Sequence, residues 1–351
     1  MFVMGSIVIG EEFVEHCKNV YDITIEREWI DYIHRIRSNL SNFIKNELEY
    51  FFPIYSDLGL DIFMTAGMII YRSLLVVNSE VEDVEEFIKI IEKTDKNIIF
   101  LNLLANYLYE YEDKIIDEIY NLDEIRNDTE KMLEIIKDIN FENEEMKKRI
   151  VDYFENPEET KLRYVLMIKS VYAKGYKEIE DEIQRRIEPF LENYVAQFEK
   201  EPSKFCKDYL KADLDFFGEV TNIHISYFYY MGIYGIRDLL SSSDYFVALG
   251  IYTDRLFKED IQSIESYKFL KTISDKTRMK IIRLLSTRPW YVNELAEELG
   301  LSSASISYHV SMLTMLNIVI LEKSNQKAYY SLNKDRLNEL FEEAKSTILN
   351  E

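Results

Sequence analysis

Cysteine is almost absent from this chain of 351 residues, which contains two cysteines, Cys17 and Cys206. They lie far apart in sequence and show none of the close spacings of zinc sites or redox pairs. A reducing cytoplasm is the simplest setting for two such thiols. We therefore expect a cytoplasmic protein whose cysteines hold no metal.

Glycine and proline are also scarce, at 10 and 5 residues, and the motifs that depend on glycine are missing. The sequence has no Gly-rich phosphate loop, no nucleophile elbow and no zinc spacing. His16 and Cys17 are adjacent, so their side chains point apart, and carboxylates such as Asp213 and Asp215 are usually solvated. We therefore expect no catalytic residues, no metal and no cofactor, and a protein that is not an enzyme.

No apolar run is long enough to suggest a membrane span. The most apolar stretch, 59–77, is interrupted by Asp61 and Arg72. The first ten residues contain no basic group and lead directly into two glutamates, which is unlike a signal peptide. We expect no membrane partner, and the apolar residues near 2–9 predict a first β-strand.

Positive charge is in short supply, because 42 Lys and Arg stand against 64 Asp and Glu, a net charge of −22. The deficit is confined to one part of the chain. Residues 266–351 hold twelve basic and ten acidic residues, whereas residues 1–265 hold 30 and 54. Affinity for DNA depends on basic groups within about 10 Å of the phosphates, so the acidic part does not prevent the C-terminal part from binding.

Helical periodicity fills most of the first 212 residues. Apolar residues recur at intervals of three and four in 29–48 and 81–91, and further helices are expected near 97–119, 123–139, 142–155, 158–173 and 176–199. Between about 218 and 250 the pattern changes to the short runs 221–227 and 244–250, which predict strands of a small sheet. The aromatic run 227–230 either lines an effector pocket or, as is commoner for tyrosines, packs in a core or an interface.

Residues 292–310 have the pattern of a helix-turn-helix. A small residue at Ala296 lets two helices cross closely, Gly300 makes the sharp turn, and Ile306 fixes the second helix on the first. The framework is completed by Leu295, Leu299 and Val310. This pattern predicts a DNA-binding unit.

The flanking segments supply the other parts of a winged helix. Residues 274–285 predict a capped supporting helix. The β-prone runs 319–323 and 327–332 surround Ser324, Asn325 and Gln326 and predict a hairpin, the wing. A final helix over about 335–348 places five apolar residues on one face, as in a packing or pairing surface: Leu337, Leu340, Phe341, Ala344 and Ile348.

The order of these elements resembles the winged-helix repressors of the ArsR type over roughly 266–349, about a quarter of the chain. Residues 274–278 look like that family's Ser-Asp-Pro-Thr-Arg corner, with Lys276 in place of the proline. Residues 293–296 and 305–310 are similar to its supporting and recognition helices. The resemblance implies a DNA-binding repressor.

The metal sites that the resemblance implies are missing. ArsR-type metal sensors carry a cysteine pair at the start of the helix before the turn, where this chain has Trp-Tyr-Val-Asn at 290–293. Other members bind metal through histidines and carboxylates on the last helix, and 333–351 contains no histidine. Metal sensing is therefore not expected.

The expected recognition helix, 303–316, contains no Lys or Arg, so small and polar side chains would contact the bases. Those side chains are Ser303, Ala304, Ser305, Ser307, Tyr308 and His309. Phosphate contacts are expected from basic residues of the supporting helix and the wing, namely Lys276, Arg278, Lys323 and Lys327. The alternative is a winged helix that has lost DNA binding and mediates only protein contacts.

We predict two domains in a predominantly α (α+β) chain. The first, 1–262, is a mostly helical sensor or assembly domain with short strands near 2–9 and 218–250; the second, 263–351, is the winged helix-turn-helix. The expected protein is a dimeric, sequence-specific repressor that binds an inverted repeat in double-stranded DNA. Its first domain would respond to a small-molecule or protein effector. Two alternatives stay open: an enzyme in the helical body, or an interaction scaffold, with the winged helix used for docking.

Overall fold

The structure is a computed structural model, and it describes residues 2–21, 23–53, 65–77, 81, 83–112, 116–141, 143–210, 214, 221–230, 233–237, 245–253, 262–324 and 327–349. At some of these positions, Ala304, Lys323 and Lys327 among them, it describes the backbone alone. The fold is predominantly helical with a few short strands, as predicted. The chain divides into two compact units: Met1–Leu191, Gly218–Tyr230 and Tyr234–Ile251 form the first, and Glu192–Phe217, Met231–Ile233 and Tyr252–Glu351 form the second.

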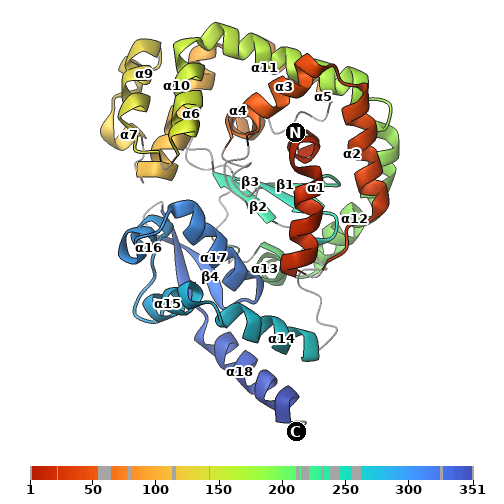
Figure 1. Ribbon diagram of the computed structural model, residues 1–351, viewed down its shortest axis with the longest axis vertical. Helices are drawn as coiled ribbons and strands as arrows, with labels where there is room; N and C mark the ends of the chain where they lie inside the picture. The colour runs from red at the N-terminus through yellow and green to blue at the C-terminus, as the bar shows by residue number, and fades with distance from the viewer. Residues whose placement is uncertain are drawn as a thin grey trace. The chain divides into compact units, whose positions relative to one another are not determined.

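Helices dominate the first unit (Figure 1). In chain order they are α1 (Phe2–Tyr21), α2 (Arg27–Asn39), α3 (Asn42–Phe51), α4 (Ala66–Val77), α5 (Val84–Lys93), α6 (Lys96–Glu112), α7 (Ile116–Ile119), α8 (Leu122–Ile125), α9 (Thr129–Asp138), α10 (Glu144–Glu155), α11 (Pro157–Val171), the π-helix η2 (Tyr172–Tyr176) and the start of α12 (Glu180–Lys200). Among the described helices, none is both long and apolar enough to cross a membrane.

A small sheet lies largely in this unit. β1 (Thr221–Ser226) and β3 (Tyr245–Gly250) pair in parallel, with Thr221 opposite Tyr245, and β3 lies between β1 and β2 (Ile233–Arg237). Val247, Ala248 and Leu249 are buried, as expected for a central strand covered on both faces. The strands predicted near 218–250 are therefore present.

The strand predicted near 2–9 is wrong, because these residues form the first turns of α1. A short apolar run looks the same in a buried helix and in a buried strand, so periodicity alone does not separate them. Val3 and Ile7 are one helical turn apart, and both are buried. The Ser6 hydroxyl donates a hydrogen bond to the carbonyl of Phe228 (2.9 Å), which ties α1 to the segment after β1.

Two helices, α2 and α3, divide the apolar stripe of 29–48 between them. Ser41 interrupts the stripe because its hydroxyl accepts a hydrogen bond from the backbone N–H of Ile44 (3.4 Å) and so caps α3. Side chains on both sides of this turn, such as Trp29 and Leu48, are buried. The stripe therefore predicts the buried residues correctly except for Phe43, which is 53% exposed, although the helix is broken.

The aromatic run 227–230 packs in the core of the first unit. Tyr227, Phe228 and Tyr230 are buried. The ring of Tyr230 meets that of Trp29 edge-on with 6.2 Å between centroids, and its hydroxyl accepts a hydrogen bond from the backbone N–H of Glu26 (3.1 Å). These contacts fix the end of β1 against α2.

An ionic network joins α3 to α10 and α11. Glu47 is 5% exposed, and its carboxylate accepts two hydrogen bonds from the Arg163 guanidinium (2.9 and 3.1 Å). The guanidinium also lies over the ring of Tyr50, 4.0 Å from its centroid, and the Tyr50 hydroxyl donates to Asp152. A carboxylate removed from water needs such a partner, because its charge is otherwise uncompensated.

Replacing Arg163 with leucine should therefore destabilise the protein. We expect Arg163→Leu to lower the free energy of unfolding by about 2–3 kcal/mol, at the low end for a broken buried pair because Arg163 is partly exposed. The double variant Glu47→Leu/Arg163→Leu should regain part of the loss, since no charge is left buried. Urea unfolding followed by circular dichroism measures both, and equal losses in the two variants would contradict this role for the pair.

The second unit contains the last part of α12, α13 (Pro202–Phe205), the π-helix η3 (Cys206–Leu210) and a winged helix. The elements of the winged helix are α14 (Gln262–Ile273), α15 (Lys276–Leu285), α16 (Val292–Leu299), α17 (Ser303–Met315), β4 (Val319–Ser324), β5 (Lys327–Leu332) and α18 (Lys334–Leu349). Their order is the one predicted from the sequence. They enclose a core of their own, in which Phe269, Ile281, Leu295, Ile306 and Leu340 are fully buried.

Candidate nucleic-acid interface

The close crossing of α16 and α17 sets the geometry of the helix-turn-helix. Ala296 is buried in the core that both helices share, and Leu295 and Ile306 are each fully buried. Val310, one turn beyond Ile306, is also buried, and Leu299 packs against the same core. Because α17 turns this apolar side inward, its opposite side carries the polar residues.

The turn between the two helices is made by Gly300. Its φ is +64°, a left-handed conformation that L side chains rarely adopt. The backbone N–H of Leu301 donates to the carbonyl of Ala296 (3.0 Å) and closes the end of α16. The Ser302 hydroxyl then accepts a hydrogen bond from the N–H of Ser305 (3.1 Å) and starts α17.

Asp275 caps the supporting helix α15. Its Oδ1 accepts hydrogen bonds from the backbone N–H groups of Thr277 and Arg278, both at 2.9 Å. Burial raises the pKa of this carboxyl, but the hydrogen bonds and the charge of Arg278 outweigh it and leave the pKa below its usual value. Lys276, which replaces the expected proline, is the first residue of α15 and is exposed.

The wing is a two-stranded hairpin extended by a single bridge. β4 and β5 are antiparallel, with Ser324 opposite Lys327 at the end of the hairpin. Trp290 pairs with Tyr330 through two backbone hydrogen bonds of 3.0 and 2.7 Å. The predicted turn residues Asn325 and Gln326 lie outside the described residues.

The predicted DNA contacts fall on these elements as follows. In α17, the side chains of Ser303, Ser305, Ser307 and Tyr308 are partly exposed. The side chains of Ala304, Lys323 and Lys327 lie outside the described residues, and their backbones belong to α17, β4 and β5. Arg278 is partly buried, and its Nε donates to the carbonyl of Thr272 (2.6 Å), so it also closes the corner between α14 and α15.

His309 differs from its neighbours because its side chain is only 15% exposed. Its Nδ1 lies 3.6 Å from Oδ1 of Asp275 and has no hydrogen-bond partner among the described residues. Burial lowers the pKa of the imidazole; the Asp275 carboxylate opposes this shift and the Arg278 charge adds to it. His309 thus packs α17 against the cap of α15, and its burial favours the neutral imidazole.

Sequence reasoning missed two contacts that hold this surface. The Ser303 hydroxyl donates to Oδ1 of Asn293 (2.6 Å), which connects the first turns of α17 and α16. Arg288 stacks on Trp290, 3.7 Å from the ring centroid, and forms two hydrogen bonds with Glu294 (3.0 and 3.1 Å). The sequence did offer one signal. Glu294 is the third residue of α16, a position at which a glutamate commonly accepts a hydrogen bond from the backbone N–H of the residue that precedes the helix.

The Arg288–Glu294 pair spans 290–293, the segment in which ArsR-type metal sensors, which the sequence resembles, carry cysteines. Among the described residues, no group of three His, Cys, Asp or Glu side chains is arranged to hold a metal ion. Asp213 and Asp215 lie outside the described residues.

α14 and α18 pack side by side at the far end of the winged helix (Figure 1). Phe269 and Phe341 meet edge-on with 4.9 Å between ring centroids, and the hydroxyls of Ser266 and Thr347 are 2.9 Å apart. The apolar face predicted for α18 is only partly buried. Leu340 and Ala344 lie in the core, whereas other apolar residues of α14 and α18 are exposed to solvent. The exposed ones are Tyr267, Leu270, Phe341, Ile348 and Leu349.

Comparison with known proteins agrees with this geometry. Residues 275–320 match the family model described as "Bacterial regulatory protein, arsR family". The transcriptional repressor SdpR of Bacillus subtilis is 38% identical over 63 residues, which are 18% of this chain and 70% of that protein. The chain belongs to the ArsR family. Its winged helix is therefore that of a DNA-binding transcriptional regulator.

Two other ArsR-type relatives match over a smaller share of their length. The HTH-type transcriptional regulator KmtR of Mycobacterium tuberculosis is 30% identical over 70 residues, 20% of this chain and 54% of that protein. The cadmium resistance transcriptional regulatory protein CadC homolog of Staphylococcus aureus is 35% identical over 78 residues, 22% of this chain and 64% of that protein. No solved structure matches the chain. The family match at residues 275–320 lies within the second unit.

The burial of neutral His309 predicts a pH-dependent contribution to stability. Its pKa is lower in the folded chain than the ordinary 6.5, so the unfolded chain takes up a proton first as pH falls. The contribution is present above about pH 6.5 and is lost as pH falls through the folded pKa. Between pH 7 and 5, His309→Gln should therefore lose less stability than the wild type; thermal unfolding at each pH measures this, and parallel losses would contradict it.

Proposed function

We propose that this protein is a sequence-specific transcriptional repressor that acts in the cytoplasm as a homodimer. The observation that carries the proposal is the polar side of α17, held outward by the buried contacts of Ala296 and Ile306. Ser305, Ser307 and Tyr308 are partly exposed there and offer hydroxyl groups of the kind that contact base edges. Lys276, Lys323 and Lys327 would contact phosphates on either side.

The proposed dimer forms through α14 and α18. Monomeric surfaces rarely leave large apolar side chains grouped in solvent, and here Tyr267 and Ile348 are 65% and 64% exposed. Two copies joined in this way would present two α17 helices to successive major grooves, about 34 Å apart, so the operator would be an inverted repeat. The first unit would respond to an effector and change the spacing of the two helices.

Removal of the α17 hydroxyls should abolish sequence preference. DNA that the full-length wild type selects from a random duplex pool should bind it at least about tenfold more tightly than scrambled DNA, measured by fluorescence anisotropy. Ser305→Ala/Ser307→Ala should bind both DNAs with similar affinity, because the base contacts are lost and the phosphate contacts stay. Ser38→Ala, at an exposed serine of α2, serves as the control and should keep the wild-type preference. A double variant that also keeps it would contradict the assignment of α17.

Negative charges placed at the C-terminal end of α18 should dissociate the dimer into monomers. Light scattering after size-exclusion chromatography should give the mass of two chains for the wild type and of one chain for Ile348→Asp/Leu349→Asp, because burying two carboxylates opposes association. Both replaced side chains are more than half exposed, so the fold should tolerate the change. Leu162→Asp, at an exposed leucine of α11, is the matched control and should stay dimeric. A wild type that elutes as a monomer would contradict the proposed dimer.

A further inference from the structure

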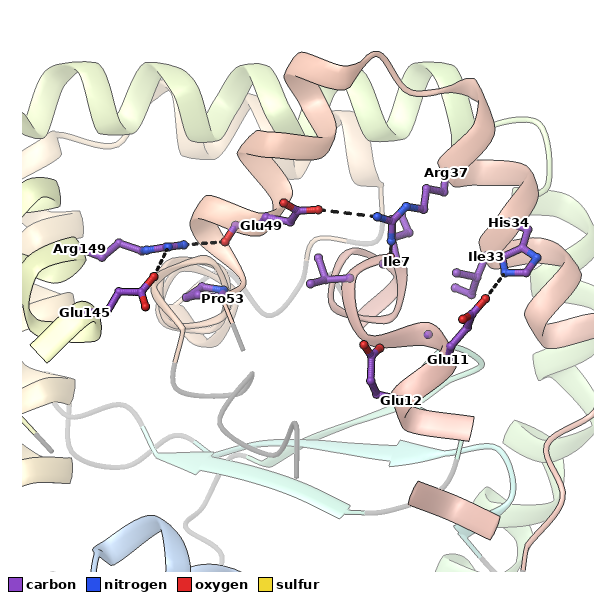
Figure 2. A pocket seen from close by; sticks show the side chains of 12 residues that line it. Ile7, Glu11, Glu12, Ile33, His34, Arg37, Glu49, Pro53, Glu145 and Arg149 are labelled. Carbon is purple, nitrogen blue, oxygen red and sulfur yellow. Dashed lines mark hydrogen bonds and ion pairs between the residues drawn. The ribbon is translucent and has the colours of Figure 1, made fainter. Parts of the chain in front are cut away.

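The first unit contains an open pocket of about 620 Å³, formed by residues of α1, α2, α3 and α10 (Figure 2). This volume is within the range of small-molecule sites. Part of its wall is apolar, from Ile7, Ile33 and Pro53, and Gly10 contributes no side chain. An added Cβ at Gly10 would lie 3.3 Å from Cγ2 of Ile33, so the wall is closely packed there.

Both arginines of the pocket are already held by its wall. Nη1 of Arg37 donates to the carbonyl of Ile7 (2.8 Å), and its Nη2 lies 3.7 Å from the Glu49 carboxylate. Nη1 of Arg149 donates to the carbonyl of Glu49 (2.8 Å), and its Nη2 lies 3.5 Å from Glu145. An anionic ligand would have to compete with these partners. Neither arginine is therefore a free anion site.

The carboxylates of the pocket outnumber its cations. Glu49 and Glu145 are balanced by Arg37 and Arg149, which leaves Glu11 and Glu12. Glu11 lies 3.7 Å from Nε2 of His34, an ion pair only when the imidazole is protonated. Glu12 has no hydrogen-bond or ion-pair partner among the described residues, and Figure 2 shows its carboxylate apart from the ion pairs of the others. Because Glu49 and Glu145 are paired with the arginines, Glu11 and Glu12 leave the lining with an excess of negative charge.

We propose that this pocket binds a small organic cation, a protonated amine with an apolar body. The amine would lie near Glu11 and Glu12, and the apolar body against Val8 and the small exposed edges of Ile7 and Ile33. Charge decides between a cation and an anion, because the fixed carboxylates attract one and repel the other. The apolar wall distinguishes an organic amine from an inorganic ion, which would gain nothing from it.

The pocket joins helices that are separate in sequence, so a bound ligand would stabilise their arrangement in the first unit. This gives the effector of the proposed repressor a chemical class and a place. Only this regulatory role rests on the proposed function. Binding of the cation itself does not depend on it.

The test uses three probes that share a phenyl ring and a short chain and differ in charge: phenethylamine, 2-phenylethanol and phenylacetate. Saturation-transfer NMR with the full-length protein detects weak binding and gives each Kd by titration. The amine should bind at least about fivefold more tightly than the alcohol or the acid, as expected for one partly exposed ion pair. Equal binding of all three probes, or binding of none, would overturn the proposal.

Variants of α1 locate the site. Glu12→Gln should weaken phenethylamine binding about threefold to fivefold, because it removes the unpaired carboxylate without changing the shape of the side chain. Glu15→Gln is the matched control, since Glu15 is an exposed glutamate of the same helix outside the pocket lining, and it should bind as the wild type does. Equal weakening in both variants, or none in Glu12→Gln, would show that the amine does not bind at this pocket.

DNA binding is measured separately on the same samples. A protein that binds the amine at the pocket but no DNA would refute the proposed repressor and leave the cation site standing. A protein that binds DNA specifically but shows no preference for the amine would refute the cation site and leave the repressor standing. A change in DNA affinity on adding phenethylamine, absent in Glu12→Gln, is the expected sign of an effector site.

Discussion

The close crossing of α16 and α17 at Ala296 is the contact on which the reading surface depends. A larger side chain at this buried position would force the helices apart, because protein interiors tolerate added volume poorly. The left-handed turn at Gly300 and the capping hydroxyl of Ser302 then fix the direction of α17. The polar side of α17 is therefore oriented by contacts that themselves touch no DNA.

Interactions at the edges of the winged helix support this crossing. His309 packs α17 on the cap of α15, and the Arg288–Glu294 pair with Trp290 holds the chain between α15 and α16. That segment carries thiolates in the metal sensors that the sequence resembles. Here an ion pair and a stacked ring fill it, so this chain stabilises the segment without a metal ligand of that kind.

The winged helix could be predicted closely from the sequence, because each of its elements has a local signal. Gly300, the β-prone wing runs and the apolar spacing of 292–310 act within a few residues of one another. The burial of His309 could not be predicted, since it depends on Asp275, 34 positions earlier in the chain. For the same reason the sequence suggested His309 as a base contact although it lies largely inside.

The first unit was harder to predict. Helical stripes predict most of the buried residues, although Phe43 is exposed, and the first turns of α1, near 2–9, were predicted as a strand because a short apolar run has no distinguishing period. The pocket could not be foreseen either. Its residues come from helices up to about 140 positions apart, and the arginines that fix its charge do so through backbone carbonyls as well as carboxylates. Such contacts leave no pattern in the sequence.

The most direct measurement of the central claim is a hydroxyl-radical footprint of the full-length protein on DNA selected from a random duplex pool. Two copies that each insert α17 into the major groove should protect two segments whose centres are about one helical turn, 34 Å, apart. The protected segments should coincide with the two halves of an inverted repeat. Uniform cleavage at protein concentrations that saturate binding, or one unbroken protected region without repeat symmetry, would contradict the account.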